Sequence, residues 1–490
     1  MRRFKDISMY FLATGAMSIS GFILVPLLVR LLSLDEFGRW TLIEPILVVG
    51  APLALLGASW GVFKQVAHDG LPPSLICRRL LPAAQPMMIA VAALAAFVLA
   101  ELGFSITVAI CMGVTVWLEA LLILETESLR AANMALAFML TQILRATVLI
   151  GLLGAAMYGW FALVKVGDVI QVRLLVAIVA ACAAAVFLRI KLGSGGTNES
   201  AQHNVGQEKM SSSALYRDAI KYGAPLLVVS LLTMLLQFSD RFIIKAYFDY
   251  NALAHYYVYV KITSAISLLV VTPFSLWWPN ERFRQRKLPD GGRGFFPQVA
   301  MIFLTILLAA SGSLWLITDW LLPFFAPGIP FNPAVILLLL FGGILAAMAY
   351  PLNVGLLDEG QTHKNIYAVL WAAIANITLA LILIPKFQLV GAAWANLLGY
   401  AVYLMTFSHF SQRVFPVAFP YGRMFVQTCL ALMFLWGFSS IIPGDSATDS
   451  GVRLAFYLCT LFIASWILGI RFKISPEPSY CSENQSTTSS

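Results

Sequence analysis

The residues of this sequence that could do chemistry are charged side chains placed inside long apolar runs. They are the cations Arg30, Arg145, Arg241 and Lys261 and the acids Glu44, Glu119 and Asp240. Inside a bilayer such a group costs at least about 2.5–3.5 kcal/mol on insertion scales, so each is a candidate functional residue. With a helical rise of about 1.5 Å per residue, Arg145 lies about 16 Å from either end of its run and Lys261 about 12 Å from the nearer end. Arg30, Arg241 and Glu44 lie about one turn inside, within reach of the membrane surface.

Around two of these charged residues, Arg241 and Lys261, further polar side chains lie on the same helix face. The two stripes consist of Ser230, Thr233, Gln237 and Arg241, and of Tyr257, Lys261 and Ser264. Their spacing of three and four residues puts each stripe on one helix face, which predicts a wet cavity or a packed interface rather than contact with lipid. The functional interpretation is a cationic cavity for an anion, in which Gln237, Tyr257 and Ser264 are suited to sugar rings.

The structural interpretation of the same charges is a set of ion pairs. The pairs would join Asp240 to Arg241 or Lys245, and Arg145 to Glu119. Glu44 is either an ion-coupling carboxylate or an interfacial one, and the interfacial role is slightly favoured. Both interpretations require that helices far apart in the sequence come together.

Motifs for catalysis and for cofactor binding are missing from the sequence. The segment Gly57-Ala-Ser-Trp-Gly61 matches the G-x-S-x-G nucleophile elbow, but that elbow needs a strand before it and a helix after it. Here it ends an apolar run, where two glycines four residues apart favour close helix packing. The five histidines are scattered and no Walker A sequence occurs. We therefore predict no catalytic residue, no metal site and no cofactor.

The composition places these residues in a membrane protein. Of the 490 residues, 60% are hydrophobic and only 11% are charged, against roughly 45–50% and 25% in a soluble domain. Fourteen runs are long enough for the about 20 apolar residues that a membrane helix needs. They lie near 8–32, 41–62, 81–101, 106–125, 134–157, 170–190, 219–246, 253–278, 296–318, 333–356, 365–384, 389–411, 423–442 and 452–471.

The orientation follows from the basic residues, because cytoplasmic loops retain Lys and Arg. With the N-terminus inside, most basic residues fall in cytoplasmic connections, and few remain outside. The outside ones are Arg39, Lys165, Arg173, Lys245, Lys386 and Arg453. This asymmetry predicts two cytoplasmic termini. It also accounts for most of the net charge of +8, so we expect no nucleic-acid partner.

Two polar segments divide the chain. Residues 191–218 are predicted to be a flexible cytoplasmic linker and 473–490 a disordered cytoplasmic tail, because they are rich in Gly and Ser or lack apolar periodicity. The remaining units are a six-helix lobe at 1–190, a second six-helix lobe at 219–411 and two further membrane helices at 412–472. Both lobes start on the same side and open with similar segments, which is typical of parallel repeats with a cleft between them.

Three segments carry a resemblance to a known family. They are Pro26-Leu-Leu-Val-Arg30 followed by Phe37-Gly38, then Phe238-Ser-Asp-Arg-Phe-Ile-Ile244, and Leu389-Val-Gly-Ala-Ala-Trp-Ala395. With them the chain resembles flippases of polysaccharide biosynthesis of the Wzx/RfbX type, in the multidrug/oligosaccharidyl-lipid/polysaccharide exporter superfamily. Arg39-Trp40 departs from the Tyr-like residues more often found there, and the linker is unusually long and polar.

The resemblance implies two six-helix lobes around a V-shaped cavity with pseudo-two-fold symmetry, plus two C-terminal helices. It implies alternating access that moves a lipid-linked oligosaccharide to the outer leaflet of a bacterial inner membrane, for O-antigen, capsule or exopolysaccharide, with no enzymatic activity. Arg30, Arg241 and Lys261 would then hold the pyrophosphate of the polyprenyl carrier, with Arg145 as a further cation on the fifth helix. The implied partners are this carrier, membrane lipids and a polysaccharide polymerase.

Two other functions compete with this one. A cation-coupled multidrug antiporter of the same fold would need buried acids, but here the buried cations outnumber them, which favours an anionic substrate slightly. A membrane glycosyltransferase or polymerase would need a sizeable outer loop, whereas the longest outer stretches, near 158–169 and 319–332, are short.

Overall fold

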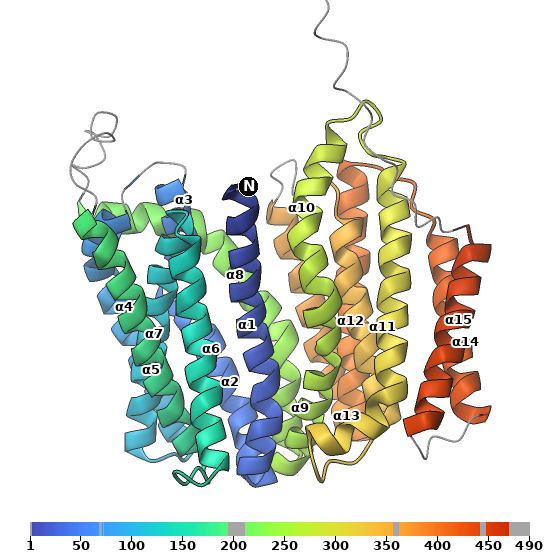
Figure 1. Cartoon of the computed structure of the whole chain (residues 1–490), viewed down its shortest axis with the longest axis horizontal. Coiled ribbons are helices and arrows are strands. Elements are labelled where there is room, and N and C mark those ends of the chain that lie inside the picture. The colour runs from blue at the N-terminus through green and yellow to red at the C-terminus, as the bar shows by residue number, and fades with distance from the viewer. Residues whose placement is uncertain are drawn as a thin grey trace, which may run out of the picture.

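The computed structural model describes residues 2–67, 71, 73–194, 211–355, 362–441 and 447–469. All the regular structure in these ranges is helical (Figure 1). The first half contains α1 (Arg2–Leu31), α2 (Leu34–Ala54), α3 (Ala58–Ala67), α4 (Pro73–Glu101), α5 (Ile106–Ala131), α6 (Ala135–Met157) and α7 (Val166–Ser194). The second half contains α8 (Ser212–Tyr247), α9 (Tyr250–Thr263), η1 (Ser267–Val271), α10 (Thr272–Arg286), α11 (Phe295–Phe325), α12 (Pro333–Leu352), α13 (Thr362–Val414), α14 (Tyr421–Ile441) and α15 (Ala447–Ile467).

The helices run up and down between two faces of one layer, as membrane helices do. Eleven of the described helical segments are long and apolar enough to cross a membrane, so the protein is a multi-pass membrane protein. We call the face where α1 begins the amino-terminal face, at the top of Figure 1, and the other the opposite face. The predicted all-helical membrane fold is confirmed.

The helices form two groups joined mainly by α8. Helices α1 to α7 pack among themselves, and α8 to α13 form the second group. The first part of α8 lies against α3 and α4, and the helix also packs against α13, so it crosses from one group to the other (Figure 1). This crossing brings the outer end of α8 beside α2 and α9, where the charged residues meet.

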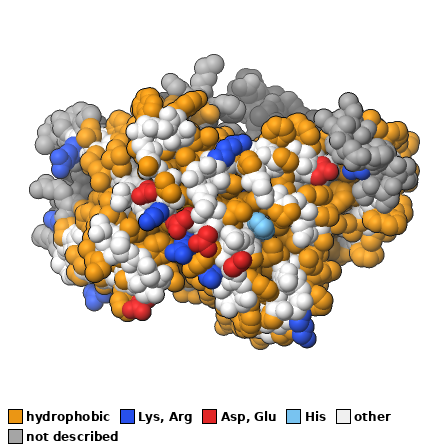
Figure 2. All heavy atoms as spheres, turned by 90° about the horizontal axis from the view of Figure 1, so that it is seen from below, with side chains coloured by type: hydrophobic (Ala, Val, Ile, Leu, Met, Phe, Trp, Pro, Cys, Tyr) orange, Lys and Arg blue, Asp and Glu red, His pale blue; other side chains and the backbone are white. Residues whose placement is uncertain are grey.

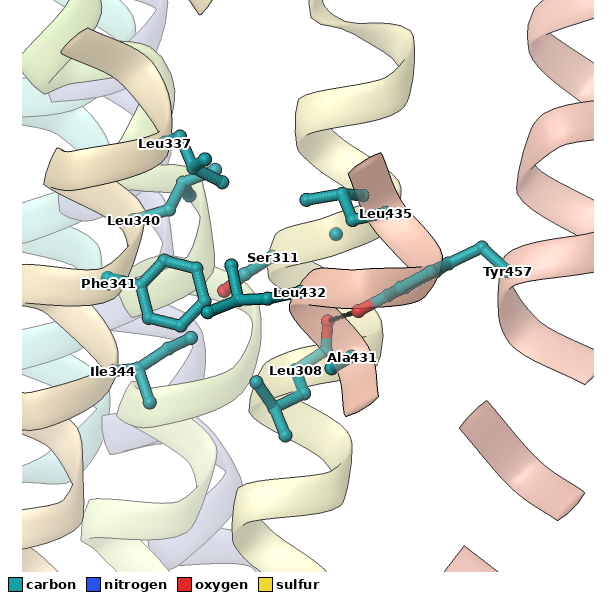
Figure 3. A pocket seen from close by; sticks show the side chains of 11 residues that line it. Leu308, Ser311, Leu337, Leu340, Phe341, Ile344, Ala431, Leu432, Leu435 and Tyr457 are labelled. Carbon is teal, nitrogen blue, oxygen red and sulfur yellow. Dashed lines mark hydrogen bonds between the residues drawn. The ribbon is translucent and has the colours of Figure 1, made fainter. Parts of the chain in front are cut away.

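Helices α14 and α15 dock on α11 at the edge of the second group. The hydroxyl of Tyr457 on α15 donates to the carbonyl oxygen of Leu308 on α11 at 2.8 Å, as Figure 3 shows. The ring lies over Gly312, which leaves room for it because it has no side chain. The gap beside this contact has a volume of only about 10 Å³ and is lined almost entirely by apolar side chains, so it is a packing defect rather than a ligand site.

The predicted membrane helix at 41–62 is wrong in one respect, because the chain breaks it into α2 and α3. Leu56 and Gly57 adopt positive φ angles of 49° and 78° at the break. The predicted close packing of Gly57 and Gly61 is confirmed: Gly57 lies against Gly223 of α8, and Gly61 against Ala219 of α8. A β-carbon at either position would collide with the α8 backbone, so α3 and α8 approach as closely as two helices can.

Two irregular helices shape the second group. The pass predicted at 253–278 is continued by the π-helical turn η1, which widens the helix at Ser267–Val271. Helix α13 consists of two arms that meet at Gln388, whose φ of 53° and ψ of −130° are not helical. Asn376 of one arm donates to the carbonyl oxygen of Ala395 of the other at 3.2 Å, so the arms pack side by side.

The predicted linker at 191–218 falls partly on helices. Helix α7 continues to Ser194 and α8 already begins at Ser212. The middle of that segment, and the predicted tail at 473–490, lie outside the described residues.

Candidate functional site

The charged residues of the two groups meet around one carboxylate, that of Glu44 on α2. Its Oε2 accepts from Nη1 of Arg241 on α8 at 3.0 Å and from the hydroxyl of Tyr257 on α9 at 2.9 Å. Its Oε1 accepts from Nζ of Lys261, also on α9, at 3.1 Å. One carboxylate is therefore shared by two cations at the junction of the two helix groups. We call these four residues the Glu44 cluster.

Close packing of α2 on α9 holds the Glu44 cluster together. Gly38 of α2 leaves space for the backbone of Tyr250 at the start of α9. Next to Gly38, the ring of Phe37 meets the ring of Tyr257 edge to face, with 5.6 Å between their centroids. Helix α9 is thereby fixed so that Tyr257 and Lys261, four residues apart, both face Glu44.

Arg241 is the most deeply buried cation of the cluster, with a side chain only 4% exposed. Its guanidinium lies between the rings of Phe238 and Tyr257, at 4.6 and 4.7 Å from their centroids. It also donates to the carbonyl oxygen of Thr41 at 3.2 Å. Aromatic faces and a carbonyl stabilise the charge that burial would otherwise penalise.

Asp240 is held apart from Lys261 and Glu44 by its own contacts. Its Oδ2 accepts from the hydroxyl of Tyr256 at 2.6 Å, and its Oδ1 from the backbone N–H of Arg241 at 2.8 Å. The Arg241 side chain pairs with Glu44, whereas the structural interpretation paired it with Asp240. Asp240 therefore fixes α8 to α9 beside the charge of Arg241.

A second ion pair lies in the first helix group. Nη2 of Arg145 on α6 donates to Oε1 of Glu119 on α5 at 2.5 Å, with side chains 17% and 12% exposed. This is the pairing that the structural interpretation predicted. Arg173 on α7 interacts electrostatically with Arg145, Glu119 and Glu44 and so links the pair to the Glu44 cluster.

Arg173 is the functional candidate that the sequence missed. The apolar run was expected to begin at residue 170, which put Arg173 near its outer end among the loop residues, but α7 begins at Val166. Arg173 therefore lies about 10 Å inside the helix, and its guanidinium stacks on the ring of Trp40 at 5.6 Å. The apolar residues Val166 and Val169 before it were the signal that could have revealed the longer helix.

Arg30 does not join these residues. It is exposed at the outer end of α1, where Nη2 donates to the carbonyl oxygen of Phe324 at 2.5 Å. Nearby, the rings of Phe22 and Phe325 lie 5.0 Å apart. Both contacts join α1 to the end of α11, so Arg30 helps to close the two groups against each other at the opposite face.

Figure 2 shows the opposite face of the molecule. Acidic and basic side chains gather near its middle, within a largely hydrophobic surround. On this side Arg39 pairs with Asp35 at 3.0 Å and lies over the ring of Tyr250 at 5.0 Å. Arg39 therefore links the start of α2 to Tyr250 at the start of α9.

Two cavities adjoin the site from the inner side. Lys261 and Ser264 line one of about 310 Å³ together with Ser18 and Phe22 of α1. Gln237 lines another of about 530 Å³ within the second helix group. Thr233 and Gln237 of one predicted stripe and Lys261 and Ser264 of the other therefore line cavities, whereas Arg241 and Tyr257 are packed in the Glu44 cluster. Lys261 reaches both its cavity and Glu44.

The described residues contain no group of three or more His, Cys, Asp or Glu side chains that could hold a metal ion. What the arrangement offers chemically is an electrostatic binding site. Arg145, Arg173, Arg241 and Lys261 carry four positive charges, and Glu44, Glu119 and Asp240 carry three negative ones. The surplus of one positive charge suits an anion.

Solved structures with this arrangement of helices are transporters. A lipid II flippase, MurJ, in an inward closed conformation matches with a TM-score of 0.65 and 12% identity, covering 93% of this chain and 98% of its own. Outward-facing and inward-facing multidrug resistance MATE family transporters match with TM-scores of 0.54 and 0.53, both at 13% identity. These two matches cover 84% and 83% of this chain, and 95% of the length of each transporter. At such identities the likeness establishes the fold alone.

Comparison at the sequence level gives the family. A search of curated proteins finds no match. A family model described as polysaccharide biosynthesis protein matches residues 4–280, more than half of the chain. The chain therefore belongs to the polysaccharide biosynthesis protein family and has the helical fold shared by the MurJ flippase and the MATE transporters.

Proposed function

We propose that this protein moves a polyprenyl-pyrophosphate-linked oligosaccharide from the cytoplasmic to the outer leaflet of a bacterial inner membrane. The observation that carries the proposal is the Glu44 cluster, where two cations from the second helix group share one carboxylate from the first. A pyrophosphate carries more charge than a carboxylate and can bind both cations at once. Family membership supports a substrate of polysaccharide synthesis.

Binding of the anion and movement of the helix groups are linked through Glu44. In this structure Glu44 ties α2 to α8 and α9 and closes the groups at the opposite face. A pyrophosphate that engages Lys261 and Arg241 from the inner cavity competes with Glu44 for them. It thereby weakens the tie between the groups and favours opening of the opposite face, which is the step that alternating access requires.

An apolar groove gives the prenyl chain a place beside this head group. The groove has a volume of about 450 Å³ and is lined almost wholly by apolar side chains of α2, α4 and α8. Pro45, next to Glu44, and Phe238, which stacks on Arg241, form its wall against the cluster. An amphiphile with a charged head at the cluster and a long hydrocarbon chain in the groove fits both surfaces.

The test removes charge from the two ion-pair sites together. In cells whose surface polysaccharide depends on this protein, Lys261→Met combined with Arg145→Gln is expected to abolish export while the protein still reaches the membrane. Lys386→Met, at an exposed position on α13, is the matched control and should leave export unchanged. Undiminished export in the double variant would refute the proposal.

A cation-coupled multidrug antiporter is the second candidate, and the buried acid Glu44 is the observation that favours it, since its side chain is only 14% exposed. That function predicts resistance to cationic drugs that Glu44→Gln abolishes. The flippase predicts no such resistance, so drug susceptibility of the wild-type and variant strains separates the two.

A further inference from the structure

The larger inner cavity lies within the second helix group, apart from the ion pairs. Its volume is about 530 Å³, a size typical of ligand sites. Helices α8, α10, α12 and α13 and the π-helical turn η1 line it. Ser267 and Thr272 belong both to this cavity and to the one that contains Lys261. The two cavities are therefore neighbours, and the cavity with Lys261 lies on the side of the Glu44 cluster.

Three buried polar atoms in the cavity wall lack a partner among the described residues: Nε1 of Trp278, Oδ1 of Asn353 and Oδ1 of Asn365. The indole Nε1–H of Trp278, on a side chain 1% exposed, has no acceptor, and Oδ1 of Asn353, on a side chain 4% exposed, has no donor. Leaving such groups unpaired costs about 1–3 kcal/mol each, so they point to a ligand that supplies both an acceptor and a donor.

The rest of the wall combines rings with small polar groups. Tyr350, Tyr400, Tyr403 and Phe407 contribute aromatic surface, while Thr233, Gln237 and Ser275 contribute hydroxyl and amide groups. Among the described residues of the lining, Arg282 is the one with a charged side chain, and its Nη1 donates to the backbone carbonyl oxygen of Asn353 at 3.2 Å. The cavity is therefore polar and aromatic, in contrast to the apolar groove beside Pro45.

We propose that this cavity binds the sugar rings of the transported molecule. A hexose presents hydroxyls that both donate and accept, which matches Asn353 and Trp278, and apolar C–H faces that pack on tyrosine rings. A hydrocarbon chain would leave these polar groups unpaired, and a pyrophosphate would be better held by the clustered cations outside the cavity. The inference rests on the proposed function and adds where the glycan binds: in the second helix group, inward from Lys261.

The experiment measures binding of the glycan and of the charged lipid separately. Purified full-length protein in detergent is titrated with two probes: the repeat-unit oligosaccharide released by mild acid from the host's lipid-linked pool, and farnesyl pyrophosphate, which has no sugar. Saturation-transfer NMR follows the oligosaccharide and thermal stabilisation follows farnesyl pyrophosphate. The variants are Trp278→Phe and Asn353→Ala, with Trp277→Phe as control because this neighbour is 41% exposed and outside the cavity lining.

The expected result is loss of affinity for the oligosaccharide alone. Each cavity variant should bind it about threefold to tenfold more weakly, the loss of about one hydrogen bond, and should bind farnesyl pyrophosphate as the wild type does. Retained binding of farnesyl pyrophosphate also shows that the variant is folded, and Asn353→Ala decides the question if Trp278→Phe is unstable. Trp277→Phe should change neither affinity.

The two hypotheses fail in different ways. Unchanged oligosaccharide binding in both cavity variants, or no oligosaccharide binding to the wild type, overturns the sugar site and leaves the flippase proposal standing. If the oligosaccharide binds and the variants weaken it but farnesyl pyrophosphate does not bind at all, the sugar site is supported and the pyrophosphate role fails.

Discussion

Neutralising Glu44 tests how the two helix groups are held together. Glu44→Gln keeps the size of the side chain but removes the charge that Arg241 and Lys261 share at 3.0 and 3.1 Å. The carbonyl oxygen of a glutamine can still accept from one of them. We expect a protein that folds but is less stable when empty, because two cations then repel each other at the junction.

The magnitude follows from burial of the pair. Removing one partner of a buried ion pair costs about 3–5 kcal/mol. The side chain of Arg241 is 4% exposed, so loss of its ion pair with Glu44 falls within that range. The side chain of Lys261 is 21% exposed, so loss of its ion pair costs less. With the remaining hydrogen bond counted, we expect about 3 kcal/mol. The matched control Arg39→Gln breaks a pair whose side chains are 39% and 48% exposed, for which about 0–1 kcal/mol is expected.

The assay is thermal unfolding of the purified protein in detergent, with and without inorganic pyrophosphate. Glu44→Gln should unfold at a clearly lower temperature than both the wild type and Arg39→Gln. Pyrophosphate should stabilise Glu44→Gln more than the wild type, because no carboxylate competes for the cations. At about 100 times its Kd a ligand adds about 2.7 kcal/mol, which would recover most of the loss.

Two results would contradict this reasoning. If Glu44→Gln has the same melting temperature as Arg39→Gln, the Glu44 cluster does not stabilise the closed junction. If pyrophosphate stabilises the wild type as much as Glu44→Gln, the anion and Glu44 do not compete for the same cations.

Two further predictions concern helix packing and the second ion pair. Gly61→Val should destabilise the protein strongly, because the new side chain meets the backbone of Ala219. The control Gly151→Val should have little effect, because Gly151 has open space around it. The yield and the melting temperature of each variant measure these effects. Arg145→Gln and Glu119→Gln should each destabilise the protein by about 3–5 kcal/mol. The double variant should lose less than their sum, and additive losses in a double-mutant cycle would show that the two side chains do not interact.

The sequence was sufficient for the class of protein and for most of its helices. Length and hydropathy of a run are local properties, and the bilayer selects on them directly, so the runs appear in the structure as helices. The same logic identified Glu44, Arg145, Arg241 and Lys261, because a charge in an apolar run stands out without knowledge of its neighbours. The sequence analysis did not predict the local backbone irregularities, such as the break at Leu56 and the π-helical turn at Ser267.

Partners across the fold required the tertiary structure. Glu44 and Arg241 are 197 residues apart. The sequence slightly favoured an interfacial role for Glu44, and its structural interpretation paired Asp240 with Arg241 or Lys245. Arg30 was expected among the cations of the cavity, but lies at the outer end of α1. The wall of the inner cavity, with Trp278 and Asn353, gave no signal in the sequence.

The sequence by itself therefore determined which segments lie in lipid and which charged residues are buried there at a cost in free energy. Which charges meet was decided by the tertiary structure, through the crossing of α8 between the groups and the close approach of α2 to α9. The physical reason is that burial acts on each residue through its own transfer free energy, whereas an ion pair depends on a distance between two helices that only packing sets.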